Sequence, residues 1–323
     1  MLFWLFIIIL SYLFFSLAYF GDKLILSGPP NPKLYTFYVS ILGILVIFFM
    51  PFTKFNIPNL TGMIFITLEA IVYILGLYTM FTALEKFDVS RVMTTIGALQ
   101  PILILSLTWI FWGTKVIIGM NFLAFMMLFL GGVIISIENP SSRNSQSSFH
   151  YGARKFKIDS KYLMLVLFSS LMFSLDYIFS KLVFLEQPFL QGLIWMRMFS
   201  FLFVLVFLFD RELKKQVFSS FDFARDNKKA TLNKKTGILF LFTQSAGGIA
   251  SLLQSFAISL VPVAYLAIIN SLRGVQYIFL FIITLFFSFL FPKILKEEIS
   301  KKIIFQKTVS ILLIVSGLAI LVL

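Results

Sequence analysis

The sequence contains no cysteine, a single histidine and few charged residues. The absence of cysteine excludes disulfides, thiolate metal sites and a cysteine nucleophile. The histidine, His150, lies in a polar stretch, and we interpret it as a solvated loop residue. The chain also lacks a Walker motif, a glycine-rich phosphate loop, a Ser–His pair and an Asp/His cluster, so neither direct ATP use nor a metal cofactor is predicted.

Charge is scarce because the chain is strongly apolar. Charged residues make up 13% of it, whereas a soluble domain carries roughly a quarter. Hydrophobic residues make up 59%, 42 of the 323 residues are phenylalanine, and the mean hydropathy is +0.98. A soluble globule of this length would need far more polar surface, so the composition predicts an integral membrane protein.

Ten apolar runs are long enough to cross a bilayer as helices, which takes about 20 residues at a rise of about 1.5 Å each. The runs are continuously apolar rather than alternating, which favours an all-α membrane protein over a barrel. The first run lacks the basic start and the cleavage pattern of a signal peptide, so we expect it to be a retained helix. The predicted spans are 2–22, 34–52, 60–83, 89–112, 116–137, 162–184, 189–209, 236–260, 263–291 and 302–323.

The distribution of basic residues predicts the orientation. Ten spans place the connections after spans 1, 3, 5, 7 and 9 on one side, which carries 21 Lys and Arg residues against three on the other. Because basic loops stay in the cytoplasm, we expect both termini to lie outside the inner (plasma) membrane. The net charge of +13 then reflects topology and contact of the basic loops with anionic lipid, so no nucleic-acid partner is predicted.

Two stretches of the chain resemble each other. Residues 15–24 (FSLAYFGDKL) and 173–182 (FSLDYIFSKL) match at six of ten positions, with a spacing of 158 residues. Chance matches among apolar segments explain Leu and Phe more easily than a shared Ser, Tyr and Lys. Further pairs at this spacing are Ser11 and Ser169, Leu13 and Leu171, and Pro30 and Pro188, and a weaker match joins Thr61 to Thr236.

The internal match divides the chain into two similar halves. We expect a first five-helix repeat at 1–137, a basic polar linker at 138–161 and a second five-helix repeat at 162–323. An odd number of helices per repeat makes the second copy enter the membrane in the opposite direction. Inverted repeats of this kind serve alternating access to a site near the bilayer midplane.

Ser16, Tyr19 and Lys23 share one helix face, because they fall at positions i, i+3 and i+7. Tyr177 and Lys181 take the same positions in the second copy. Two interpretations stay open: the two faces line a shared pathway, or the lysines extend to the interfaces and the tyrosines belong to an aromatic belt.

Charged and amide side chains interrupt several spans. Because such groups are costly in lipid, they are expected to face a cavity or a partner, and we predict a polar solute site near the midplane, with interhelical hydrogen bonding as the alternative. Arg273 is the candidate for recognising an anionic group, or for pairing with Glu69 or Asp176 when the site is empty. Glu69 is the candidate carrier of a coupling proton. The candidate substrate-binding residues are Tyr19, Glu69, Gln100, Tyr177, Gln244, Asn270, Arg273 and Gln276, and the candidate structural or coupling residues are Asp176, Arg197 and Pro101.

Several further motifs accompany the repeat and extend over essentially the whole chain. They are the repeated first-helix motif, Pro30, Pro188, Arg197, Phe81–Leu84 before Val89-Ser90, Gln100-Pro101, Ala257–Ala264, Lys296-Glu297-Glu298 and Ser316-Gly317. With these motifs the chain resembles the drug/metabolite transporter superfamily, specifically its EamA-type ten-helix members. The resemblance implies that helices 1–4 and 6–9 surround a central cavity while helices 5 and 10 are peripheral.

Two features depart from that family pattern. The acidic residue after the fourth helix of a half is matched by Glu297 or Glu298, but the first half has Gly113-Thr114-Lys115 instead. Members of the family are usually drawn with cytoplasmic termini, whereas the charge count here predicts the reverse.

The sequence and the resemblance together predict a secondary transporter rather than an enzyme. It would move a small metabolite (an amino acid, nucleoside or organic anion) by alternating access, without a cofactor, with a proton as candidate coupling ion, and as a monomer or homodimer. The alternatives are a lipid-carrier flippase and a membrane-embedded transferase acting on a lipid-linked substrate. For the transferase the only candidate acid/base pair is Glu85 and Asp88, which we interpret as solvated turn charges.

Overall fold

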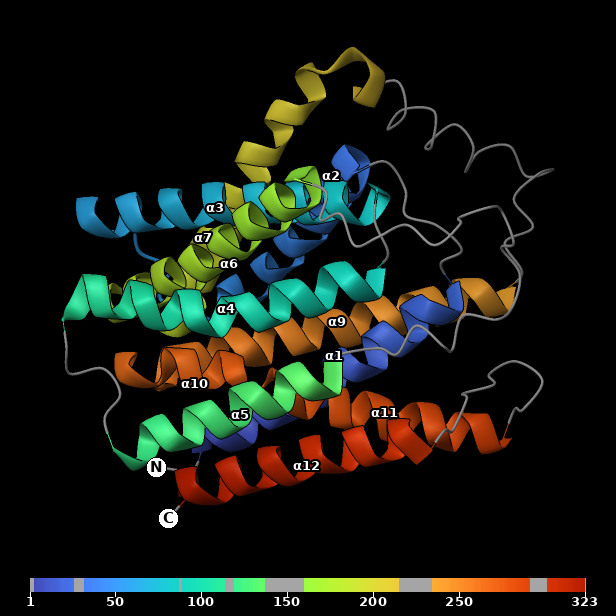
Figure 1. Cartoon of the computed structure of the whole chain (residues 1–323). Coiled ribbons are helices and arrows are strands. Elements are labelled where there is room, and N and C mark those ends of the chain that lie inside the picture. Colours follow the sequence, from blue (N-terminus) through green and yellow to red (C-terminus); the bar gives the residue numbers. More distant parts are fainter. Residues whose placement is uncertain are drawn as a thin grey trace.

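The computed structural model describes residues 3–25, 32–86, 89–113, 119–136, 160–214, 234–290 and 301–322, and all regular secondary structure within them is helical. The main helices run side by side with their axes roughly along one direction (Figure 1). They are α1 (Phe3–Ile25), α2 (Pro32–Gly43), η1 (Ile44–Phe52), α3 (Leu60–Lys86), α4 (Val89–Trp112), α5 (Met120–Ser136), α6 (Ser160–Glu186), α7 (Phe189–Val204), η3 (Leu205–Phe209), α9 (Lys234–Leu260), η4 (Val263–Tyr265), α10 (Leu266–Ser271), α11 (Arg273–Leu290) and α12 (Lys301–Val322).

Proline and glycine mark several helix ends. Pro188 precedes α7 and Pro262 precedes η4, where the missing N–H of proline costs no helical hydrogen bond. Helix α4 ends at Trp112 because Gly113 adopts φ +85°, a conformation that side chains disfavour. There the N–H of Gly113 donates to the carbonyl of Trp109 at 2.8 Å and closes the last turn.

The chain is an integral multi-pass membrane protein. Within the described residues, seven helical stretches are long and apolar enough to cross a membrane. Large apolar side chains also cover the outer surface, since Phe48, Phe52, Ile110 and Phe305 are each more than 70% exposed (72%, 80%, 73% and 72%). A surface of this kind suits lipid rather than water. The seven stretches are Phe3–Gly21, Pro32–Phe52, Leu60–Glu85, Thr95–Trp112, Ser160–Glu186, Phe189–Phe209 and Val263–Ile283.

Helices from the first half of the sequence pack against helices from the second half. Helix α1 lies along α9, α3 lies along α6, and α5 lies along α12 at one edge of the bundle (Figure 1). Glycine permits the last of these contacts, because a Cβ on Gly317 of α12 would lie 2.9 Å from Cγ of Leu128 and 3.1 Å from the carbonyl oxygen of Ala124 on α5. The small residue lets the two backbones approach closely.

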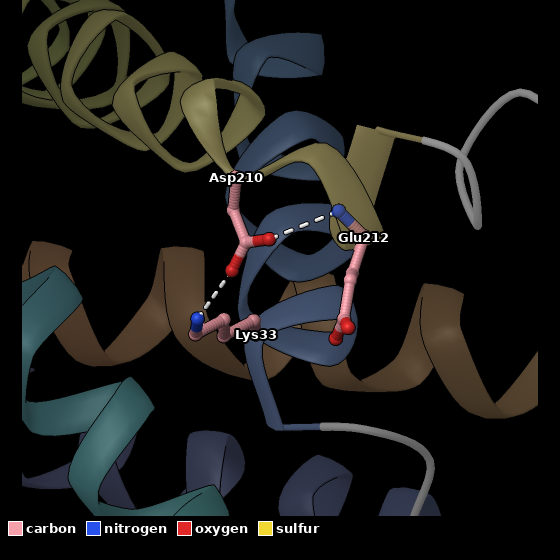
Figure 2. Close-up of polar contacts among 3 residues, drawn as sticks. All are labelled: Lys33, Asp210 and Glu212. Carbon is pink, nitrogen blue, oxygen red and sulfur yellow. Dashed lines mark hydrogen bonds and ion pairs between the residues drawn. The ribbon is translucent and has the colours of Figure 1, made fainter.

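Polar contacts join helix ends that are distant in the sequence. Lys33, at the start of α2, donates a hydrogen bond of 2.5 Å to Oδ2 of Asp210, directly after η3 (Figure 2). The backbone N–H of Glu212 donates to the other oxygen of Asp210 at 3.0 Å. At another place Nδ2 of Asn59, before α3, donates to Oε2 of Glu186 at the end of α6, at 3.1 Å.

Each of the ten predicted spans coincides with one helix or with two or three consecutive helical elements, with differences at the bounds. The fifth begins at Met120 rather than 116, because Gly119 with φ +65° precedes it. The second divides into α2 and η1, and the ninth is interrupted at Leu272 between α10 and α11. His150, Asp88, Glu297, Glu298 and nearly all of the linker 138–161 lie outside the described residues.

Candidate functional site

Two groups of polar side chains lie inside the apolar bundle. We call the first the Arg273 cluster; it consists of Tyr12 from α1, Gln100 from α4, Tyr177 from α6, Asn270 from α10 and Arg273 from α11. We call the second the Glu69 cluster; it consists of Glu69 and Tyr73 from α3, Asp176 from α6 and Arg197 from α7. Most of these residues lie near the middle of their helices, at the depth where polar groups in a membrane protein require a partner.

Hydrogen bonds to backbone carbonyls fix α1 against the interrupted ninth span. Tyr12 is fully buried and donates to the carbonyl of Ile269 at 2.7 Å. Ser16, one turn later on α1, donates to the carbonyl of Gln276 at 2.8 Å and also to that of Tyr12 at 2.7 Å. The interruption at Leu272 therefore lies between two points at which α1 is attached.

Arg273 is the only cation of its cluster, and it contacts an amide rather than a carboxylate. Its Nη1 donates to Oε1 of Gln100 at 2.5 Å. The hydroxyl groups of Tyr12, Tyr19, Tyr177 and Tyr277 are the titratable groups that surround it. Within the described residues no carboxylate forms an ion pair with the guanidinium.

Two buried side chains of the Arg273 cluster lack hydrogen-bond partners among the described residues. Asn270 is 0% exposed, and Tyr177, which lies beside it, is 4% exposed. In the part of the chain that the structure describes, neither the amide of Asn270 nor the hydroxyl of Tyr177 makes a hydrogen bond. Buried polar groups are seldom left unpaired, so these atoms point to a ligand or water in the working protein.

A small cavity adjoins the cluster, with room for about one water molecule. Gly97 of α4 keeps this place open, because a Cβ there would lie 3.0 Å from the hydroxyl oxygen of Tyr277 and 3.7 Å from Cδ of Arg273. The cavity is lined by Gly97, Pro101, Phe129, Gly132, Val133, Asn270, Ser271, Arg273, Gly274 and Tyr277.

The Glu69 cluster is more acidic. Glu69 is 0% exposed, and the charged groups close to it are Asp176 and Arg197. The guanidinium of Arg197 lies over the ring of Tyr73, with its Cζ 4.5 Å from the ring centroid. Neither oxygen of Glu69 has a hydrogen-bond partner within the described residues, and neither has Nη1 of Arg197.

Helix α6 connects the two clusters. Asp176 belongs to the Glu69 cluster, and Tyr177, its neighbour in the sequence, belongs to the Arg273 cluster. Successive residues of a helix point about 100° apart, so one turn of α6 presents a side chain to each cluster.

Lys181 joins α6 to the end of α9. It is 3% exposed, and its Nζ donates to the carbonyl oxygens of Ile258 at 3.2 Å and Ser259 at 2.9 Å. These carbonyls belong to the last turn of α9 and have no partner within that helix. The lysine therefore caps the C-terminal end of α9.

The structure divides the candidate residues predicted from the sequence. Gln100, Tyr177, Asn270 and Arg273 come together, with Tyr19 (39% exposed) also near Arg273 and Pro101 lining the adjoining cavity. Arg197, rather than Arg273, is the arginine that interacts electrostatically with Glu69 and Asp176, and within the described residues neither carboxylate forms an ion pair with Arg273. Gln276 is buried and Gln244 is half-buried on α9.

Sequence reasoning missed three tyrosines, namely Tyr12, Tyr73 and Tyr277. Each lies one helical turn from a residue that was singled out: Ser16, Glu69 and Arg273, respectively. Considering the residues four positions before and after each candidate would have found these tyrosines, because such residues share a helix face. Among the described residues, no group of three or more His, Cys, Asp or Glu side chains could hold a metal ion.

Comparison with known proteins bears on the fold. No family model matches the sequence, and none of the curated proteins matches it. A crystal structure described only as that of a protein aligns with 98% of this chain and 96% of its own, with a TM-score of 0.62 and 13% sequence identity. At this identity the similarity shows the fold alone. Because it extends over nearly all of both chains, the whole polypeptide shares one known helical architecture with that protein.

Proposed function

We propose that the protein is a secondary transporter of the drug/metabolite transporter type, which moves a small polar metabolite across the inner membrane by alternating access. The observation that carries the proposal is the Arg273 cluster. A membrane-embedded guanidinium without a carboxylate partner lies beside an unpaired amide and an unpaired phenol, near the middle of the bundle. Polar groups in that position are costly unless they serve a solute.

The chemistry of the cluster favours a solute with a carboxylate or another anionic group. The guanidinium supplies a fixed positive charge with several N–H donors, which match the two oxygens of a carboxylate. The Tyr177 hydroxyl and the Asn270 amide supply further donors and acceptors for a second polar group. Amino acids and small organic anions fit this set better than an uncharged nucleoside.

Contacts between helix ends support a topology of ten crossings. Lys33 and Asp210 lie together with six predicted spans between them, and Asn59 and Glu186 lie together with four between them. Lys181 and Ser259 meet with two spans between them. An even number of crossings returns the chain to the same side, so each contact agrees with the proposed alternation.

Matched hydrogen bonds support the inverted repeat. Ser11 on α1 donates to the carbonyl of Ala250 on α9 at 2.8 Å, and Ser169 on α6 donates to that of Gly76 on α3 at 3.2 Å. The two serines keep the spacing of 158 residues, and the two acceptors are 174 residues apart, close to the 175 that separates Thr61 from Thr236. Each half thus attaches its first helix to the third helix of the other half by an equivalent bond.

The orientation with basic loops in the cytoplasm is part of the proposal and can be tested directly. Because the chain has no cysteine, single-cysteine variants can be made without altering the background. We expect Lys54→Cys to react with a membrane-impermeant maleimide added to intact cells, and Lys214→Cys to react only after the membrane is opened. The reverse pattern would place the termini in the cytoplasm.

The transport function is tested with purified protein in liposomes, by screening labelled amino acids, organic anions and nucleosides with and without a proton gradient. We expect saturable uptake of an anion-bearing solute, which Arg273→Ala abolishes and which the exposed-residue control Lys54→Ala leaves unchanged. If no labelled solute enters although the protein is folded, transport of small metabolites is rejected. That outcome would favour a flippase or a transferase for a lipid-linked substrate.

A further inference from the structure

We propose that the small cavity beside Arg273 is a subsite for one hydrogen-bond donor of the solute, a hydroxyl or an ammonium group that neighbours its anionic group. The backbone carbonyl of Gly97 and the amide of Asn270 receive that donor. The inference rests on the proposed transport function. It narrows the solute to an anion with an N–H or O–H donor on the carbon next to its anionic group.

A proline inside α4 frees a backbone carbonyl at the wall of this cavity. Pro101 has no N–H, so it cannot donate to the carbonyl of Gly97, four residues before it. The missing helical hydrogen bond would lie between these two residues, and both of them line the cavity. Gly97 also has no side chain that could cover its own backbone, which lets a ligand approach closely. Helix α4 therefore offers the solute an acceptor.

Asn270 supplies a second acceptor from α10. Its side chain is 0% exposed and lines the same cavity, and among the described residues neither Oδ1 nor Nδ2 has a hydrogen-bond partner. A buried amide without partners is costly, which favours a ligand at this point. Asn270 precedes Arg273 by three positions, so the amide and the guanidinium share one face of the ninth span.

The cavity has the size of one such group. It has room for about one water molecule, which is close to the size of a hydroxyl or an ammonium group. A Cβ on Gly97 would lie 3.0 Å from the hydroxyl oxygen of Tyr277 and 3.7 Å from Cδ of Arg273. A methyl group there would therefore occupy the space that the donor needs.

The polarity of the walls separates two parts of the solute. The guanidinium of Arg273 can only donate hydrogen bonds, and the carbonyl of Gly97 can only accept them. Gln100, three residues after Gly97, holds the guanidinium at 2.5 Å, so α4 fixes both groups. A plain carboxylate would satisfy Arg273 and leave the acceptors without a donor. An amino acid or a hydroxy acid satisfies both.

Two series of compounds with matched carbon skeletons test the subsite on the purified protein. The first is alanine, lactate and propionate, and the second is phenylalanine, phenyllactate and 3-phenylpropionate. In each series the last compound lacks the donor, and the first two distinguish an ammonium from a hydroxyl group. We expect the preferred donor to give about 10- to 100-fold tighter binding than the compound without one.

Three substitutions should reduce this preference. Pro101→Ala restores the N–H that pairs with the Gly97 carbonyl, and Asn270→Leu removes the other acceptor at similar size. Gly97→Ala fills the cavity, so it should weaken binding of the compound with the donor and leave the plain carboxylate unchanged. Gly248→Ala is the matched control, because no atom lies within 4 Å of its Cβ, and it should keep the full preference.

The subsite is rejected if the three members of a series that binds have equal affinities for the wild type, or if either Pro101→Ala or Gly97→Ala keeps the full preference. A size-exclusion profile identifies a variant that fails to fold, and the wild-type affinities then decide. Absence of binding by all six compounds also rejects the subsite. A preference without uptake keeps the subsite and rejects transport, whereas uptake without a preference keeps transport and rejects the subsite.

Discussion

Arg273 of α11 donates a hydrogen bond of 2.5 Å to Gln100 of α4, and so joins helices from opposite halves of the chain. The amide orients the guanidinium without neutralising it. A bound anion would therefore meet a positive charge that is already in place, which lowers the cost of ordering the site.

Removing the amide should weaken solute binding less than removing the charge does. A hydrogen bond to a charged group contributes about 1.5–3 kcal/mol, so we predict that Gln100→Leu reduces affinity about 10- to 100-fold. Arg273→Lys keeps the charge but loses the planar fork, and should lie between Gln100→Leu and Arg273→Ala. The affinity of each purified variant is measured for the solute that the uptake screen identifies. If the Arg273 variants bound that solute as tightly as the wild type does, Arg273 would not belong to the site.

The packing of α5 against α12 predicts a contrast between two glycines. Gly317→Ala places a Cβ 2.9 Å from Leu128 Cγ and 3.1 Å from the carbonyl of Ala124, so the helices must separate. Overpacking of this kind costs about 1–3 kcal/mol. Gly248→Ala is the matched control, because no atom lies within 4 Å of its Cβ. Thermal unfolding in detergent should give a lower midpoint for the first variant only; equal midpoints would contradict the close contact.

The cap on α9 predicts a stability loss without any change in the solute site. Lys181→Met keeps the length of the side chain but removes both hydrogen bonds, to Ile258 and Ser259. We expect a loss of about 1.5–3 kcal/mol, seen as a lower unfolding midpoint in detergent. The exposed Lys214→Met serves as the control. An unchanged midpoint for Lys181→Met would mean that the α9 carbonyls find other donors.

The ion pair at the end of η3 predicts a weak dependence of stability on acid. The hydrogen bond from Lys33 holds the pKa of Asp210 below its usual value. A carboxyl whose pKa is lower in the folded state stabilises the protein above its unfolded pKa of about 3.9, and this contribution is lost as the pH falls through the folded pKa. Both partners are partly exposed to solvent, so the effect should be small.

Unfolding midpoints measured between neutral and acidic pH test this dependence. Asp210→Asn should lower the midpoint slightly at neutral pH and make no difference at the acid end. Glu212→Gln is the control, because Glu212 contacts Asp210 through its backbone N–H rather than its carboxylate (Figure 2). A larger effect at the acid end would reverse the sign and reject the argument.

The helices could be predicted from the sequence because hydropathy over about 20 residues is a local property. The helix boundaries at Gly113 and Pro188 could be predicted as well, because the apolar runs end there. The interruption at Leu272 was not, since no proline or glycine marks that residue itself and its backbone remains helical.

The division of the polar residues into two clusters could not be predicted. Glu69, Asp176, Arg197 and Arg273 all lie at bilayer depth, and the sequence allowed either arginine to face the carboxyl groups. The choice depends on the rotation of each helix about its axis, which long-range packing such as α3 on α6 determines. Tyr12 and Lys181 depend likewise on which backbone carbonyls lie across the interface.

The adjacency of Asp176 and Tyr177 on α6 has a thermodynamic consequence. If occupancy of one cluster shifts α6, affinity at the other changes, and the two effects must be equal in magnitude. A ligand of the Glu69 cluster that strengthened binding at the Arg273 cluster about tenfold would itself be held about tenfold more tightly when the Arg273 cluster is occupied. The single helix α6 would then couple binding at the two clusters, and no chain of intermediate contacts would be needed.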